Sequence, residues 1–208
     1  MTDLEITQLF NPSALMKINE SVQRAYGYAD IYIQDMDILH LPSAAPARQI
    51  VRNLSVDLML ERDCTSGRLP MKYKYTNNLA NNCKHIELFY EGKILTHSSV
   101  DKNILPRKSI FRKSYASTNQ ISLDDPEGHL TFLAPSFGVI THQVCFAKER
   151  SCTVCLVIPD NDYGHACNQI PLHKLSKPLM IAKPSADFED FNFELKKRVA
   201  EEDIYNAT

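Results

Sequence analysis

Short apolar runs separated by turn residues fill the middle of the chain, and this alternation restricts the fold more than any other feature. Runs of this length, bounded by Gly, Pro, Asn and Asp, are typical of β-strands. Turn residues at Glu91-Gly92, 125–128, 148–150 and 160–164 predict short connections, so we expect a mostly antiparallel sheet. The predicted strands are Met71–Tyr75, His85–Tyr90, Ile121–Leu123, Leu130–Leu133, Val139–Ala147 and Ser151–Ile158.

A helix is predicted before these strands, over about residues 12–26. Asn11 can cap its first turn, and Pro12 suits the first helical position because its missing N–H has no acceptor there anyway. Gly27 is the expected end of the helix. The apolar residues at helical spacing are Leu15, Ile18, Val22 and Ala25.

The next segment predicts a linker followed by a strand. Leu41 to Pro46 is bounded by prolines and predicts an exposed loop. From Gln49 the pattern alternates with period two, which favours a half-buried strand that ends at the turn Thr65-Ser66-Gly67. The residues that share the apolar parity are Ile50, Leu54, Val56, Leu58 and Leu60.

A second helix is predicted at the C-terminal end. Ser185 can cap it, Asp187 complements the helix dipole, and Phe188, Phe191, Leu195 and Val199 form one apolar stripe. The predicted fold is therefore α+β in a single domain, with an N-terminal helix, a mostly antiparallel sheet and a C-terminal helix. We divide it into an N-terminal arm, 1–48, and a globular part, 49–208.

Composition excludes several classes of protein. The 208 residues carry a formal charge of −2, which argues against a protein that coats nucleic acid, and they suffice for one sizeable core. The first residues do not form a signal peptide, and the longest stretch free of Asp, Glu, Lys and Arg, 128–147, is too polar to span a membrane. The six cysteines are accordingly expected to be reduced thiols.

Two sets of residues could be taken for metal sites. Cys152 and Cys155, with His165 and Cys167 nearby, have zinc-like spacing. Residues three apart on a strand point to opposite faces, so we expect buried thiols and leave zinc as an alternative. The turn that starts at Asp160 resembles the opening of a calcium loop, but its glycine stands at the fifth position, which favours a hairpin turn.

Enzyme motifs are missing from the sequence. It has no G-x-S-x-G, Walker, G-x-G-x-x-G or H-E-x-x-H pattern, and we expect neither an enzyme nor a cofactor. An enzyme with a cysteine nucleophile remains an alternative, because Cys and His residues can meet in space without a sequence motif.

Basic residues gather between Lys102 and Lys113, in a stretch without an acid from Asp101 to Asp124. Apolar residues, among them Ile104 and Ile110, are interleaved with them. Cations beside apolar side chains are what an anionic surface would attract, whether lipid headgroups or a nucleocapsid. The alternative is a solvated loop. The candidate contacts are Lys102, Arg107, Lys108, Arg112 and Lys113.

The order of these segments over roughly residues 26–195 resembles the matrix proteins of rhabdoviruses, in the form of a divergent member, for example from a plant virus. The similarity lies in layout. Its segments are Tyr26-Gly27-Tyr28, Asp35-Met36-Asp37, Val51–Glu61, Glu127-Gly128, Leu133-Ala134-Pro135, Lys148-Glu149-Arg150, Asp160-Asn161-Asp162 and Phe188-Glu189-Asp190-Phe191.

This resemblance implies a virion protein that is not an enzyme. Such a protein self-associates, binds the viral ribonucleoprotein and the anionic inner leaflet of the envelope, and supports budding. It would be found in the virion, in the host cytoplasm and at the inner face of the host membrane, and also in the host nucleus, with the envelope glycoprotein and host factors as further partners. The competing hypothesis is an interaction protein that does not assemble, such as a silencing suppressor, a movement protein or a bacterial effector.

Overall fold

A computed structural model describes residues 10–77, 84–101, 104–119, 121–122, 131–132, 136–145, 152–175 and 186–206. Two long helices come first, α2 (Pro12–Asp35) and α3 (Ala45–Thr65), with the short 3₁₀ helices η1 (Asp37–His40) and η2 (Pro42–Ala44) between them. The later helices are α4 (Ile110–Ala116), the 3₁₀ helix η3 (Leu172–Lys174) and α5 (Ala186–Asn206).

One sheet holds the molecule together. Its strands are β1 (Lys72–Asn77), β2 (Lys84–Tyr90), β3 (Lys93–Ser99), β6 (Phe137–Val144), β7 (Cys152–Pro159) and β8 (Ala166–Ile170), in that order across the sheet. Every pair is antiparallel except β3 and β6. A separate short pair joins β4 (Ile121–Ser122) to β5 (Thr131–Phe132).

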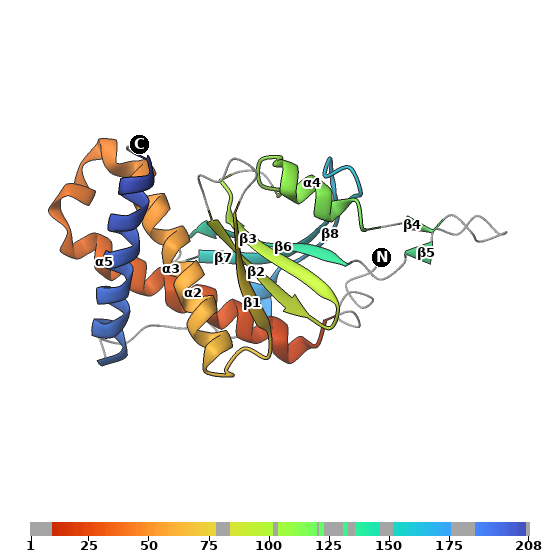
Figure 1. Ribbon diagram of the computed structural model, residues 1–208, viewed down its shortest axis with the longest axis horizontal. Coiled ribbons are helices and arrows are strands. Elements are labelled where there is room, and N and C mark those ends of the chain that lie inside the picture. The colour runs from red at the N-terminus through yellow and green to blue at the C-terminus, as the bar shows by residue number, and fades with distance from the viewer. Residues whose placement is uncertain are drawn as a thin grey trace.

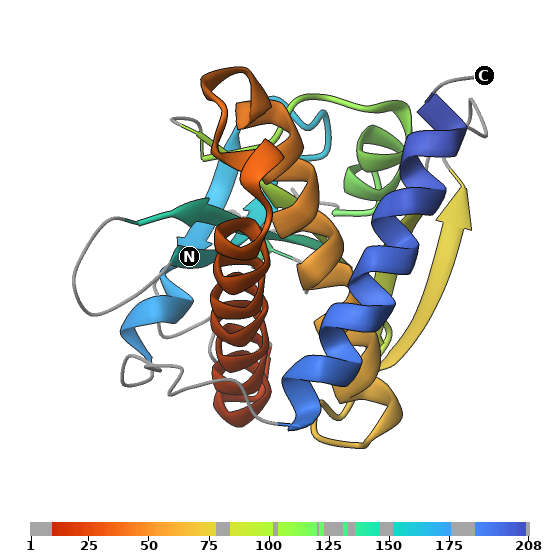
Figure 2. The same ribbon diagram turned by 90° about the vertical axis from the view of Figure 1, so that its left-hand side faces the viewer.

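Helices cover one face of this sheet. Helices α2, α3 and α5 lie side by side on one face, and α4 lies apart from them (Figures 1 and 2). The predicted α+β single domain with N-terminal and C-terminal helices is confirmed. No helix in the described part of the chain is long and apolar enough to cross a bilayer.

Helix α2 begins as predicted but ends later. The Asn11 side chain accepts a hydrogen bond from the Ser13 N–H (2.9 Å), with Pro12 in the first turn. The expected end at Gly27 is wrong, because Ala29, Tyr32 and Ile33 continue the buried stripe to Asp35. Their burial outweighs the cost of about 1 kcal/mol that a glycine brings to a helix interior.

The strand and linker predicted before residue 66 are also wrong. Residues 45–65 form helix α3, and the proline-bounded segment forms η2 and the first turn of α3. The apparent alternation arises because α3 is buried over a broad arc, more than half of its circumference. Its buried residues are Val51, Ser55, Val56, Leu58, Met59, Leu60 and Asp63. The division at residues 48 and 49 falls inside α3. The turn after Thr65 forms as predicted, with Gly67 at a φ of 73°.

Most predicted strands form close to their predicted bounds. The Glu91-Gly92 hairpin turn is confirmed by positive φ angles of 47° and 77°. Strands β3 and β8 and helix α4 were not predicted. Strand β3 holds only Ile94 and Leu95 as apolar residues, so its sequence gave no strand signal, and pairing on both edges stabilises it. The predicted turns at 125–128 and 148–150 lie outside the described residues.

Each face of the sheet has its own core. The larger core, on the face of the long helices, includes the predicted stripe of α5, in which Phe191 and Leu195 are fully buried and Val199 packs at the edge. The smaller core lies under α4 and is formed by Ala116, Phe137, Val139 and Tyr163. Helix α4 packs on the sheet through this smaller core.

Gly138 allows β6 to pack closely against its neighbours. A Cβ atom there would lie 3.0 Å from Leu95 Cδ2 and 3.1 Å from Leu156 Cδ1. We expect Gly138→Ala to lower the free energy of unfolding by about 1–2 kcal/mol, because the core must shift to admit a methyl group. Urea denaturation measures this, with Gly164→Ala as a control within about 0.5 kcal/mol of the wild type. Equal stability of both variants would contradict this packing.

Candidate functional site

The cations predicted to bind an anionic surface lie in and just before α4. Arg107, Lys108 and Lys113 are exposed. Ile104 and Ile110 are exposed beside them, at 50% and 71%. Exposed isoleucines next to cations form the kind of surface that the sequence predicted. Lys102 lies outside the described residues.

Two aromatic side chains hold α4 on the sheet. The Phe111 ring stacks on His85 of β2, with centroids 4.0 Å apart. The Tyr115 hydroxyl donates a hydrogen bond to Glu87 Oε1 (2.6 Å), and burial together with this bond raises the Tyr115 pKa to about 12. A seven-residue helix does not form stably alone in water, so these contacts fix its position.

Arg112 differs from the other predicted cations because it is turned inward. Its guanidinium lies over the Phe111 ring, and its Nη1 donates to the Arg107 carbonyl oxygen (3.1 Å). Its Nε is buried without an acceptor, and burial lowers the pKa of the group. No carboxylate within the described ranges forms an ion pair with it. Arg112 is thus a largely buried cation without a counter-charge.

The turn between β7 and β8 lies beside α4 (Figure 1) and packs against it through Tyr163 and Ala116. Asp160 forms the predicted turn, with its carboxylate accepting from the backbone N–H groups of Gly164 and His165. Tyr163 has a φ of 53° and is 1% exposed, and its hydroxyl has no partner. The Lys108 Nζ lies 4.0 Å from where a Cβ atom of Gly164 would be. Sequence reasoning missed Tyr163.

A chain of buried polar groups runs through the opposite face of the sheet. Tyr26 Oη lies 2.8 Å from His142 Nδ1, His142 Nε2 lies 3.0 Å from His97 Nδ1, and His97 Nε2 lies 2.6 Å from Asp57 Oδ1. All three bonds form if each group donates to the next, with both imidazoles neutral and the aspartate ionised. The chain ties α2 and α3 to the two central strands, and its burial makes it structural.

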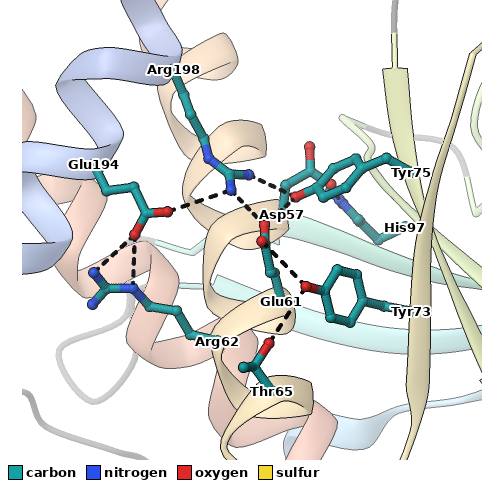
Figure 3. Close-up of polar contacts among 9 residues, drawn as sticks. All are labelled: Asp57, Glu61, Arg62, Thr65, Tyr73, Tyr75, His97, Glu194 and Arg198. Carbon is teal, nitrogen blue, oxygen red and sulfur yellow. Dashed lines mark hydrogen bonds and ion pairs between the residues drawn. The ribbon is translucent and has the colours of Figure 1, made fainter.

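A second polar network fastens α5 to α3 and β1 (Figure 3). Arg198 donates to the Tyr75 hydroxyl (2.6 Å) and pairs with Glu61. Glu194 accepts from Arg62 (3.0 Å). Burial raises the pKa of Tyr75, so its hydroxyl stays neutral. Thr65 and Tyr73 extend the network to the end of α3.

The residues with zinc-like spacing do not converge, in line with the expected thiols rather than the zinc alternative. Cys152 is buried beneath the long helices, and Cys155, three residues on in the same strand, points to the other face and is partly exposed. Among the residues that the structure describes, no cluster of His, Cys, Asp and Glu side chains could hold a metal ion.

Comparison with known proteins found no match: no family model matches the chain, and neither does any curated protein or solved structure.

The buried histidines predict acid sensitivity. Burial, with a contribution from His97, holds the pKa of His142 well below its usual 6.5. The unfolded chain therefore binds a proton on His142 that the folded state does not bind. The free energy of unfolding has its full value above pH 6.5 and decreases below that pH, by up to about 1.4 kcal/mol per pH unit. His142→Gln should flatten this slope between pH 7 and 5 in denaturant titrations, whereas the exposed His165→Gln should not. An unchanged slope would contradict the buried neutral state.

The polar network around α5 predicts that removing either of two neighbouring cations on this helix lowers the stability by different amounts. Arg198→Ala leaves Glu61 and Tyr75 without their shared donor and should lower the free energy of unfolding by about 1–3 kcal/mol. Lys197→Ala, at an exposed position of the same helix, should cost less than about 0.5 kcal/mol. Thermal or urea unfolding compares the two, and a similar loss in both would show that Arg198 adds nothing beyond helix propensity.

Proposed function

We propose that this protein is a structural protein that self-assembles and binds an anionic surface, in the manner of a viral matrix protein that bridges the ribonucleoprotein to the inner face of the envelope and supports budding. The observation that carries this proposal is the surface of α4, where Arg107, Lys108 and Lys113 are exposed beside Ile104 and Ile110.

Physical chemistry supports a membrane contact for this surface. Each Lys or Arg near an anionic leaflet contributes about 1 kcal/mol, and an exposed isoleucine adds apolar area that the interface can cover. Further cations lie on the same face of the sheet. Lys74 on β1 lies opposite Glu87 on β2, which contacts α4. Lys72 lies on the same face of the sheet because it is two residues from Lys74 on the strand. Both lysines are exposed.

A different surface favours the competing function, an interaction protein that does not assemble. At the corner between α2 and α3, Ile38 and Leu41 are 64% and 52% exposed, with Asp35 and Asp37 exposed beside them. An acidic apolar corner of this kind suits a basic protein partner more than a membrane.

Paired charge variants test the proposed function. Arg107→Gln/Lys108→Gln should weaken binding to vesicles of phosphatidylcholine with 30% phosphatidylserine by roughly tenfold to thirtyfold, the loss expected for two surface cations. The matched control is Lys196→Gln/Lys197→Gln on α5, which removes the same charge from another surface. Vesicle sedimentation measures both, and equal binding of the two double variants would remove the assigned role of α4.

Sedimentation velocity tests the assembly that the proposal requires. We expect large species at low salt that dissociate reversibly as salt rises, since contacts between exposed charges are screened. A single small species at every salt and protein concentration would instead support the interaction protein.

A further inference from the structure

We propose that the α4 surface of one copy of this protein docks on the acidic corner of a second copy, so that the protein assembles head to tail. The acidic corner is the turn from α2 to α3, where Asp35, Asp37, Ile38 and Leu41 are exposed. This inference rests on the proposed function, because it names the contact through which the proposed self-assembly occurs.

The first argument is that exposed apolar side chains gather at these two places. In the described part of the chain, five large apolar side chains are at least half exposed, and the corner and the α4 surface hold two each. These four are Ile38, Leu41, Ile104 and Ile110. The fifth, Phe193 of α5, has an aspartate three residues before it and lysines three and four residues after it, so its surroundings favour neither sign of charge. Docking the corner on α4 removes both apolar pairs from water at once.

The corner is held in place from the inside. Leu39 is 8% exposed and belongs to the larger core, and its neighbour Ile38 remains 64% exposed. The guanidinium of Arg48 donates to the carbonyl oxygens of Leu39 (2.6 Å) and Leu41 (3.0 Å), so it fixes the backbone of the turn. Helix α4 is likewise held on the sheet by its aromatic side chains. Two surfaces that are ordered before they meet lose less entropy on docking.

The second argument is charge complementarity. The corner presents the carboxylates of Asp35 and Asp37, and the α4 surface presents Arg107, Lys108 and Lys113. Among the described residues, no ion pair occupies any of these five side chains. Docking therefore brings opposite charges together around a shared apolar contact, and a basic apolar surface is the kind of partner that the corner suits.

The two surfaces lie at separate places on the molecule. In Figure 1 the corner is the orange turn at the left end, and α4 lies to the right of α3. One copy therefore cannot cover its own corner, and the contact joins two different patches. A contact of this heterologous kind repeats into an open row or a ring. An open row ends in one free α4 surface, so the first copy can bind an anionic membrane while its corner holds the next copy.

The corner can be tested without changing any charge. In the full-length protein, Ile38→Ser/Leu41→Ser should raise the protein concentration at which large species form at low salt by about tenfold or more. Phe193→Ser removes an equally exposed apolar side chain from α5 and should assemble as the wild type does. Sedimentation velocity compares the three proteins. Assembly of the corner variant at wild-type concentrations would overturn the proposed contact.

Mixing two variants distinguishes a head-to-tail contact from other contacts. Ile38→Ser/Leu41→Ser keeps its α4 surface, and Arg107→Glu/Lys108→Glu keeps its corner. Each variant alone should sediment as a single copy. Their mixture should form a one-to-one pair that does not grow, because it offers only one intact surface of each kind. A mixture in which both variants remain single copies would overturn the head-to-tail contact.

Vesicle binding separates failure of this contact from failure of the proposed function. Ile38→Ser/Leu41→Ser should bind phosphatidylserine vesicles as the wild type does, because its α4 surface is unchanged. If this variant assembles normally while Arg107→Gln/Lys108→Gln loses vesicle binding, the contact is rejected and the proposed function stands. If the wild type binds vesicles but remains a single copy at every salt concentration, both the proposed assembly and this contact are rejected.

Discussion

Helix α3 is buried on two sides at once, and the arrangement of the other elements depends on this. It contacts α2 and α5 and also the strands β1, β2 and β3. A helix in this position exposes little of its surface to solvent. Its acidic side chains therefore need hydrogen-bonding or charged partners within the protein. Asp57 pairs with His97, Glu61 with Arg198, and Asp63 with Arg24. These polar contacts fix how α2, α5 and the sheet are positioned against α3.

The same two-sided burial explains where sequence reasoning failed. The cap at Asn11 and the stripe of Phe191 and Leu195 are local signals, and both predicted real helices. Leu54, Val56, Leu58 and Leu60 alternate like a strand because the buried arc of α3 is unusually broad, and a single sequence shows no sign of the several partners that cover it. Strand β3 was missed because its sequence is mostly polar and carries no strand pattern. It is a strand because β2 and β6 pair with its two edges.

The candidate site was predictable in part. A run of cations without acids identified Arg107, Lys108 and Lys113, which are exposed. The same run gave no sign that Arg112 turns inward, because that depends on Phe111 stacking on a strand. Tyr163 carried no signal at all, since it packs with Ala116 of α4 only through the fold of the β7–β8 turn. Local composition identifies an exposed surface, whereas a buried site depends on tertiary contacts.

The single parallel pair, β3 with β6, divides the sheet into two antiparallel halves, β1–β2–β3 and β6–β7–β8. Each half joins strands that are close in sequence, so each can form early from local hairpins, while their union must wait for a long loop to close. The α4 surface is carried on that connection. Phe111 and Tyr115 anchor α4 to β2, so the sheet constrains these inward positions of the connection and leaves its exposed positions free to change.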